Sequence, residues 1–289
     1  MDTLPTWYNM KYVSELVHME MHDLLVMATK SRIPMGKGQG SVNIHRDDML
    51  RLFDEISRDV PRHRHDLTGC ILPHIDLPWA KTLTAIYRED AAFPASISPQ
   101  QGEFVRSVIQ NINPKRCLEI GCFIGASTMW ICSALEDCNK GGLLHSVDLY
   151  GDKLPFKGIK YMILLDALSY IRKRLEEAGL SHRNVQHEGN SHEIGTRYDQ
   201  KIGEELDFLF IDGDHTIDGA LKDFLLYGPH LKKGGYLLFH DIYPEVCGWD
   251  GPDYVIKNFI ATQPGRYQFV DLNTRPQNYG MCLIKKIDN

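Results

Sequence analysis

The feature that most constrains the fold is a strict alternation of short apolar segments and helical segments from residue 98 onward. Five apolar segments occur at 116–120, 143–149, 184–187, 206–211 and 236–239, and helical patterns follow at 126–135, 160–178, 217–227 and 252–261. Strands that alternate with helices pair in parallel, and their largely apolar character indicates burial on both faces. The sequence therefore predicts a doubly wound, mostly parallel α/β sheet of the Rossmann-like kind.

Both ends of this regular region carry further signals. Ser98-Pro99-Gln100-Gln101 predicts a helix start, with Ser as the N-cap, Pro at the first helical position and Gln three residues after the cap. Two last apolar segments, 267–271 and 279–285, are separated by a short link, which predicts an antiparallel hairpin. The hairpin completes a predicted sheet of seven strands.

The first 95 residues lack the regular alternation of strand-like and helical segments found in the rest of the chain. Segments 13–30 and 47–56 carry helix-spaced apolar positions, and a glycine-rich stretch at 34–40 lies between them. That stretch lacks the spacing of a phosphate-binding loop, so we expect a flexible connector or a lid. The sequence predicts a helical N-terminal extension over 1–95, acting as a lid or substrate-selecting region, and a cofactor-binding domain over 96–289.

Charge and hydropathy limit the cellular compartment and the binding partners that we expect. The net charge is -6, and the most basic stretch, 58–65, is short and interrupted by proline. A solvated loop is the better interpretation of that stretch, and nucleic acid is not expected as a partner. No apolar run approaches the ~20 residues that span a membrane, and the N-terminus lacks a secretory pattern. We expect a cytoplasmic protein that does not bind membranes; the sequence leaves open whether it forms a homo-oligomer.

The cysteine pattern agrees with a reducing compartment. None of the seven cysteines belongs to a C-x-x-C pair, and several lie inside apolar runs, where a thiol packs as a small hydrophobe. We therefore expect neither a disulfide framework nor a structural zinc site. The residues are Cys70, Cys117, Cys122, Cys132, Cys138, Cys247 and Cys282.

The first predicted strand of the sheet ends in a glycine-rich turn, Leu118-Glu119-Ile120-Gly121-Cys122-Phe123-Ile124-Gly125. Glycines at such a turn let the backbone approach a ligand closely. Glu119 lies two residues before the first glycine, where an acid suits a cationic amino group and a sulfonium better than a pyrophosphate. The spacing also differs from the dinucleotide pattern G-x-G-x-x-G. A tight turn without a ligand is the alternative.

The next two strands end in polar residues. Asp148 follows the glycine loop by the distance at which an acid binds ribose hydroxyls. Its alternative role is a capping or salt-bridged Asp. Asn190 and Ser191 follow the third strand and are placed to bond an adenine edge, although polar loops are common at this point of such folds.

The fourth and fifth strands end in Asp212-Gly213-Asp214-His215 and His240-Asp241. The carboxyl ends of parallel strands are where open α/β sheets bind ligands. Carboxylates from neighbouring strands together with His215 predict a metal-and-base site, while Asp214 is expected to cap the helix that follows. Hydrogen bonding to backbone at the strand ends is the alternative for Asp212 and Asp241.

These segments resemble a known family. Residues 98–135 resemble the opening of catechol and caffeoyl-CoA O-methyltransferases, and the segment FLFIDGDHTIDGALKDFLLYGPHLKKGGYLLFHDI is similar to macrolide-sugar O-methyltransferases and their relatives. The similarity runs from about Ser98 to the C-terminus. It implies a class I S-adenosylmethionine-dependent methyltransferase acting on a hydroxyl of a small molecule, such as a sugar or a catechol-like compound.

The resemblance also implies roles for particular residues. His215 matches the position of the catalytic base. The cofactor S-adenosyl-L-methionine would contact Glu119, Gly121, Cys122, Phe123, Gly125, Ser127, Asp148, Leu149, Asn190, Ser191 and Asp212. A divalent metal, Mg²⁺ in this family, would be held by Asp212, His240 and Asp241. His240 departs from the family's Asp-Asn or Glu-Asp pair, and because Mg²⁺ prefers oxygen ligands, the identity or the presence of the metal stays open.

Three other functions are compatible with parts of the pattern. One is a domain that binds S-adenosylmethionine and performs other chemistry, which product analysis distinguishes. A nicotinamide-dependent dehydrogenase is disfavoured by the glycine spacing, and a binding assay with both cofactors separates the two. A non-catalytic scaffold is disfavoured by the joint presence of Glu119, Asp148, Asp212, His215 and Asp241.

Overall fold

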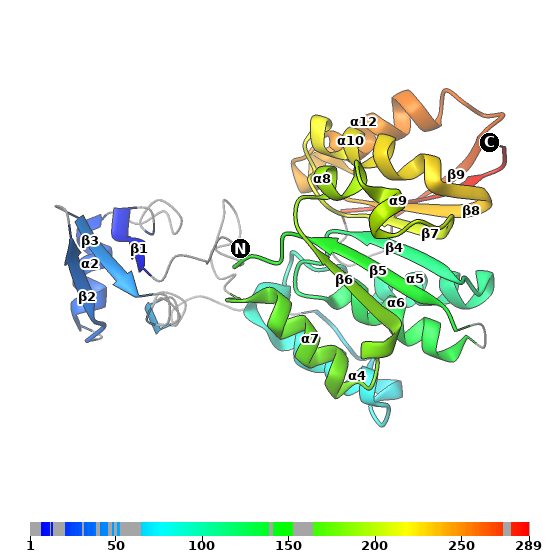
Figure 1. Ribbon diagram of the computed structural model, residues 1–289. Helices are drawn as coiled ribbons and strands as arrows, with labels where there is room; N and C mark the ends of the chain where they lie inside the picture. The colour runs from blue at the N-terminus through cyan, green and yellow to red at the C-terminus, as the bar shows by residue number, and fades with distance from the viewer. Residues whose placement is uncertain are drawn as a thin grey trace.

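The computed structural model describes residues 7–11, 13, 21–30, 32–38, 41–45, 48, 51–52, 65–138, 141–152, 164–273 and 279–288. Its centre is a seven-stranded sheet (Figure 1). The strands are β4 (Arg116–Ile120), β5 (Leu143–Asp148), β6 (Asn184–Glu188), β7 (Leu206–Ile211), β8 (Leu231–His240), β9 (Tyr267–Leu272) and β10 (Met281–Lys286). Each predicted strand is present.

The strand order is β6-β5-β4-β7-β8-β10-β9. All pairs from β6 to β8 are parallel, whereas β10 runs antiparallel to both β8 and β9. The predicted doubly wound sheet with a C-terminal antiparallel hairpin is therefore confirmed. Chain order reverses between β4 and β7, so the loops after these strands diverge and open a crevice at the carboxyl edge.

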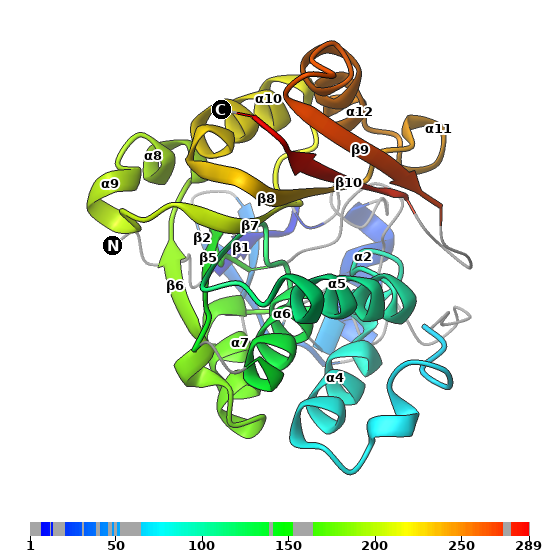
Figure 2. The same cartoon turned by 90° about the vertical axis from the view of Figure 1, so that its right-hand side faces the viewer.

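Helices cover both faces of this sheet (Figures 1 and 2). One face is covered by α4 (Pro78–Arg88), α5 (Pro99–Ile112), α6 (Ala126–Asp137) and α7 (Ala167–Glu177). The other face carries α8 (Ser191–Gly195), α9 (Tyr198–Lys201), α10 (Ile217–Tyr227) and α12 (Gly251–Val255), with α11 (Pro244–Cys247) nearby. Short 3-10 helices occupy Leu72–His74, Asp90–Ala92, Ser181–Arg183 and Gly228–His230, and a π-helical turn occupies Ile256–Ile260.

The start of α5 has the predicted form. The side chain of Ser98 accepts a hydrogen bond from the Gln101 backbone N–H, and the Gln101 side chain accepts one from the Ser98 backbone N–H. This reciprocal capping box satisfies two backbone donors that a helix start otherwise leaves without partners. The helix expected at 160–178 begins at Ala167 in the structure, and residues 153–163 lie outside the described part of the chain.

The N-terminal part contains strands as well as helix. Beside α2 (Met21–Lys30), a three-stranded antiparallel sheet is formed by β1 (Trp7–Asn9), β2 (Met35–Gly38) and β3 (Ser41–His45), in the order β1-β3-β2. The sheet was not predicted, and β2 occupies much of the stretch expected to be a flexible connector. The segment Ser41–His45 alternates polar and apolar residues with the period of a strand, a signal too short to stand out beside the helical spacing around it.

Packing separates this small unit from the main sheet. Buried residues between Tyr8 and Leu52 form a cluster of their own, whereas Ile71, α4 and Ile97 pack in the same core as α5 and α6. Most of the expected helix at 47–56, and the basic stretch before His65, lie outside the described residues. Among the described residues, no helix is both long and apolar enough to cross a membrane.

Candidate active site

The glycine loop after β4 packs tightly against the end of β7. Gly121 has a φ of 86°, and a Cβ at this position would lie 2.0 Å from the backbone oxygen of Asp212. Gly125 has a φ of 85°, and its Cβ would lie 2.9 Å from the Ile171 side chain. Both positions therefore need glycine for conformation and for space. The loop brings the ends of β4 and β7 together at the crevice.

Asp148, at the end of β5, holds this loop in place. One carboxylate oxygen accepts hydrogen bonds from the backbone N–H groups of Cys122 at 2.8 Å and Phe123 at 3.0 Å. The other oxygen accepts one from the Tyr150 backbone N–H at 2.7 Å. These bonds connect the end of β5 with the turn after β4, so Asp148 belongs to the framework of the loop.

Glu119 lies deeper than expected. Its side chain is fully buried, and one oxygen accepts hydrogen bonds from the hydroxyls of Thr128 at 2.6 Å and Ser146 at 3.0 Å. The other oxygen has no hydrogen-bond partner of good geometry among the described residues. Burial raises the pKa of Glu119 to about 7, although the neighbouring hydroxyls act in the opposite direction.

A cavity of about 1230 Å³ opens at the carboxyl edge of the sheet. This volume is ample for a nucleoside-sized ligand together with a small second molecule. Its wall includes Gly121, Phe123, Asp148, Leu149, Asn190, Ser191, Asp212, His215, Asp241, Trp249 and Tyr279. Cofactor residues expected from the glycine loop and charged residues expected from β7 and β8 therefore share one cavity.

Two carboxylates and two imidazoles form a compact cluster, of which Asp212, His215 and Asp241 line the cavity. The Nε2 atom of His215 lies 3.2 Å from Asp212 Oδ1 and 3.1 Å from Asp241 Oδ2. On the other side, His240 Nδ1 lies 3.2 Å from Asp212 Oδ1 and 2.9 Å from Asp241 Oδ1. Each imidazole thus bridges carboxylates that come from neighbouring strand ends.

The cluster shifts the pKa values of its members. Burial would raise the pKa of Asp212, but the two imidazoles outweigh it and lower that pKa to about 2. For His215, burial acts downward, while the hydrogen bond to Asp212 and the charges of both carboxylates raise its pKa above the ordinary 6.5. Burial likewise acts downward on His240, and the carboxylates outweigh it and raise its pKa. Asp212 is therefore ionised at neutral pH.

Gln101 contacts the far side of His240. Its amide nitrogen lies 2.9 Å from His240 Nε2, and both side chains are buried. The contact joins the start of α5 to the end of β8.

Comparison with known proteins indicates a methyltransferase domain. Residues 118–242 match a family model described as a methyltransferase domain. A catechol O-methyltransferase from Niastella koreensis is 29% identical over 153 residues, which cover 53% of this chain and 60% of the relative. The chain spans less than two thirds of the length of the curated relatives that it matches.

Solved structures share the fold. The O-methyltransferase from Bacillus cereus, in complex with SAH, has a TM-score of 0.58 at 20% identity, covering 76% of this chain and 94% of that one. The O-methyltransferase TomG from Streptomyces achromogenes, involved in tomaymycin synthesis and in complex with SAM, has a TM-score of 0.55 at 20% identity, covering 72% and 90%. The chain therefore has a methyltransferase fold.

Within this methyltransferase fold, the expected cofactor residues fall into two layers. Those that line the cavity are Gly121, Phe123, Asp148, Leu149, Asn190, Ser191 and Asp212. Those that lie behind its wall are Glu119, Cys122, Gly125 and Ser127. The Asn190 side chain caps α8 by accepting from the His192 backbone N–H at 2.9 Å, so its amide is partly engaged.

One expected role was wrong. Asp214 does not cap α10, because Thr216 is the N-cap and accepts from the Gly219 backbone N–H. The Asp214 carboxylate instead accepts from the Thr216 backbone N–H at 2.9 Å, in the turn before the helix.

Several cavity residues were missed by the sequence analysis. Trp249 and Tyr279 line the cavity from the segments that follow β8 and precede β10. Trp249 is 45% exposed, which is high for a large aromatic side chain. The sequence signal that could have identified Trp249 is its position between Gly248 and Asp250, shortly after the end of a strand. Gln101 was identified only as a capping residue.

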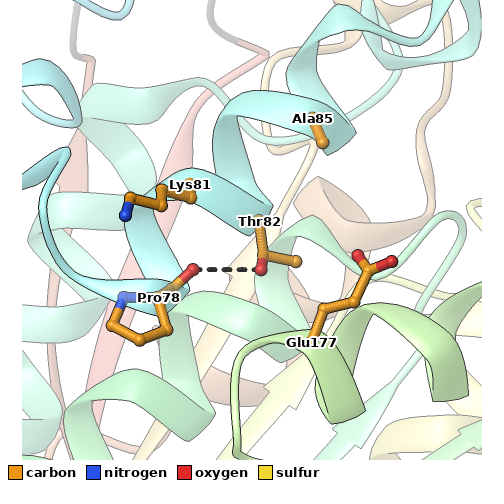
Figure 3. A pocket seen from close by; sticks show the side chains of 5 residues that line it. All are labelled: Pro78, Lys81, Thr82, Ala85 and Glu177. Carbon is orange, nitrogen blue, oxygen red and sulfur yellow. Dashed lines mark hydrogen bonds between the residues drawn. The ribbon is translucent and has the colours of Figure 1, made fainter.

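A second depression lies between α4 and α7 (Figure 3). Its volume is about 350 Å³, and it is lined by Pro78, Lys81, Thr82, Ala85 and Glu177. The Thr82 hydroxyl donates within its own helix to the Pro78 carbonyl at 3.0 Å. None of the site residues predicted from the sequence lines this depression.

Proposed function

We propose that this chain transfers a methyl group from S-adenosylmethionine to a hydroxyl of a small molecule, with His215 as the general base. One observation carries the proposal. His215 lies within 3.2 Å of carboxylates from both β7 and β8 at the wall of a cavity that also contains the glycine loop. A base, a positioned carboxylate pair and a cofactor loop thus face the same space.

The cofactor would be held by the wall between β4, β5 and β6. Gly121 lets the backbone approach the ligand, and Asp148 lines the cavity where a carboxylate can accept from ribose hydroxyls. Leu149 is 65% exposed, an apolar surface suited to the face of an adenine ring. Bound S-adenosylmethionine supplies an electrophilic methyl group on a sulfonium sulfur.

A divalent cation fits the carboxylates of this cluster. Asp241 Oδ1 is buried without a hydrogen-bond partner of good geometry among the described residues. Ligand atoms of Asp212, His240 and Asp241 lie within 4.8 Å of one another. Asp212 and Asp241 would hold the ion, and a cation bound there lowers the pKa of an acceptor hydroxyl.

Residues of the chain itself would then remove the proton of the acceptor hydroxyl. Asp212 and Asp241 hold the His215 ring by its Nε2 side and stabilise the imidazolium that forms when the ring takes a proton. Holding the acceptor beside the cofactor in a fixed geometry contributes a further large part of the rate increase. Proton removal by a positioned base is worth about 10²–10⁴-fold.

The remaining wall suits a flat or ring-shaped acceptor. Trp249 and Tyr279 present aromatic surface beside His215 and Asp241. A vicinal diol on a sugar or a catechol-like ring would place one oxygen at the base and the other at the cation.

One contact supports the lid role that we propose for the N-terminal unit. The hydroxyl of Tyr8 donates a hydrogen bond of 2.8 Å to the carboxylate of Asp152, which follows β5 closely in the chain.

The test combines binding with product analysis. Calorimetry with S-adenosylhomocysteine and with NAD is expected to show binding of the first alone. The full chain, given S-adenosylmethionine with a labelled methyl group and a panel of catechols, sugars and small-molecule extracts, is expected to leave the label on an oxygen. Binding of NAD in place of S-adenosylhomocysteine, or label on nitrogen or carbon, contradicts the proposal.

A further inference from the structure

We propose that β9 pairs with β9 of a second copy of this chain, antiparallel and around a twofold axis at Phe269, so that the two main sheets become one. The strand order ends in β10-β9, and Figure 2 shows β9 as the outermost strand beside β10. The pairing does not depend on the reaction proposed above. It makes the chain a homodimer, a point that the sequence leaves open.

The backbone groups of β9 divide between its two sides. The Ile287 N–H donates to the Arg266 carbonyl at 2.8 Å, and these two residues continue the register in which Tyr267 lies opposite Lys286. Residues along an antiparallel pair alternate between those that bond to the neighbouring strand and those that face away from it. Even-numbered residues of β9 therefore bond to β10, and odd-numbered residues direct their backbone N–H and C=O groups to the free edge.

This edge lacks the features by which proteins prevent strand addition. Such features are proline, lysine, a bulge or a covering segment. The strand has the sequence YQFVDL and pairs with β10 without a break in register. Within the described part of the chain, no backbone hydrogen bond reaches the outward groups of Phe269 or Asp271. Phe269 and Val270 are also 42% and 50% exposed, so a strand that pairs here covers apolar surface as well.

Twofold symmetry restricts how two copies of one strand can pair. Opposite residues point to the same face of the sheet, so the axis must pass through one residue. With the axis at Phe269, the two copies of this residue exchange a pair of backbone hydrogen bonds. The Asp271 N–H of each copy then meets the Tyr267 carbonyl of the other. The Tyr267 N–H needs no partner across the edge, because it donates to the Gln263 carbonyl at 3.0 Å.

The side chains are complementary in the same register. Asp271 of one copy lies opposite Tyr267 of the other, and the Arg266 guanidinium lies over that ring, 5.6 Å from its centroid. Arg266 Nε is buried without a hydrogen-bond partner of good geometry among the described residues. Each Asp271 carboxylate therefore approaches an arginine of the other copy, a favourable pair that symmetry repeats. The two Phe269 rings form an aromatic pair at the centre.

Other ways to cover this edge match the charges less well. A twofold axis at Val270 places Asp271 opposite Phe269 and brings the two aspartates to diagonal positions, where like charges repel. A strand from a different protein supplies backbone bonds, but the reciprocal match of Arg266 and Asp271 exists only between two copies of this chain. The second copy is therefore the occupant that these charges favour.

Two substitutions test the backbone and the charges of this pairing. Phe269→Pro removes an N–H that faces the free edge, so the bonds to β10 are retained. It also removes the central ring pair and is expected to weaken dimerisation at least about tenfold. Asp271→Arg brings two arginines together and is expected to weaken the dimer similarly, whereas Asp271→Arg combined with Arg266→Asp is expected to restore it. Asp218→Arg, exposed on α10, is the matched control for the change of charge.

Sedimentation of the full chain measures its mass, and a cross-link measures the register. Wild type and Asp218→Arg are expected to sediment at twice the mass of the monomer. Opposite residues in a hydrogen-bonded pair have Cα atoms ~5.5 Å apart, a distance that a disulfide spans. Phe269→Cys is therefore expected to form a covalent dimer on oxidation at least about tenfold faster than Val270→Cys, whose copies are diagonal neighbours.

Three results would overturn the proposal. One is a wild-type chain that stays monomeric up to about 100 µM, which leaves the edge to a different partner. Another is a dimer that Phe269→Pro and Asp271→Arg both leave unchanged, which places the interface elsewhere. The third is faster cross-linking of Val270→Cys than of Phe269→Cys. If Phe269→Pro does not fold, the charge exchange and the cross-link still decide. None of these measurements involves methyl transfer, so the failure of either proposal is recognised separately.

Discussion

The carboxylate of Asp148 accepts a hydrogen bond of 2.8 Å from the backbone N–H of Cys122, in the middle of the glycine loop. Together with a second bond from Phe123, this contact ties the end of β5 to the turn after β4. Asp148 therefore shapes the wall of the cavity in addition to lining it.

Replacement of Asp148 by Ala is expected to weaken binding of S-adenosylhomocysteine by at least about 1.5–3 kcal/mol, the worth of hydrogen bonds to a charged group. The loss combines the ribose contact with the disturbed loop. Calorimetry measures it, with Asp218→Ala on the exposed face of α10 as the control. A folded Asp148→Ala variant with wild-type affinity would remove this residue from the site.

The place of the site was predictable, because the carboxyl ends of parallel strands must meet at one edge. Asp212, His215 and Asp241 come together for that reason. The depth of each side chain was not predictable from strand position. Glu119 and Asp148 both lie near strand ends, yet the first is buried against hydroxyls of α6 and β5 while the second lines the cavity.

The contact of Gln101 with His240 joins residues that are 139 positions apart. The capping motif predicts the local bonds of Gln101, since these depend only on residues three apart. Which other side chain lies against the cap depends on how α5 packs against the sheet. Such long-range neighbours, like the aromatic wall formed by Trp249 and Tyr279, become visible only in the fold.

Divalent-metal dependence is the second expectation. Exhaustive chelation is expected to lower turnover, and Mg²⁺ to restore it, because a bound cation lowers the pKa of the acceptor hydroxyl. Asp241→Asn is expected to need a higher Mg²⁺ concentration for the same rate, since the charge that attracts the ion is removed. Full activity after chelation, with Asp241→Asn equally active, would exclude the metal from the reaction.

The pH profile provides a third check. His215 acts as a base only without its second proton, and the carboxylates around it raise its pKa above 6.5 against the effect of burial. Turnover is therefore expected to be low in acid and to rise with pH as the ring loses its second proton. Asp241→Asn removes one of these charges and is expected to lower the midpoint. Turnover in wild type that does not fall in acid disagrees with the assignment.

Asp223, on α10, should limit stability at neutral pH. Its side chain is fully buried, and neither oxygen has a hydrogen-bond partner of good geometry among the described residues. Burial raises its pKa from 3.8 to about 6, against the attraction of His192, so the folded state holds the proton more tightly than the unfolded state. The resulting penalty is absent at a pH below 3.8, grows as the pH rises, and is complete above about 6.

Asp223→Asn is accordingly expected to raise the free energy of unfolding at pH ~8 by up to about 3 kcal/mol, because each tenfold difference in proton affinity between the two states is worth about 1.4 kcal/mol. The gain should disappear near pH ~4. Urea titrations of variant and wild type at both pH values measure it, and Asp218→Asn on the same helix is the exposed control. A variant that is less stable than wild type at pH ~8 would show that the ionised carboxylate stabilises the fold.

The last prediction concerns His215 itself. If it removes the acceptor proton, His215→Ala should keep its affinity for S-adenosylhomocysteine and lose about 10²–10⁴-fold in turnover. The loss should shrink at high pH, where the acceptor hydroxyl ionises without help. Two other roles give different results. A ring that only holds Asp212 in place would cause a small loss or a less stable protein, and a ring that binds the metal would show as lost metal affinity. Turnover against pH, metal titration and thermal unfolding of the same variant separate these outcomes, and near-normal turnover at neutral pH would end the assignment of His215 as the base.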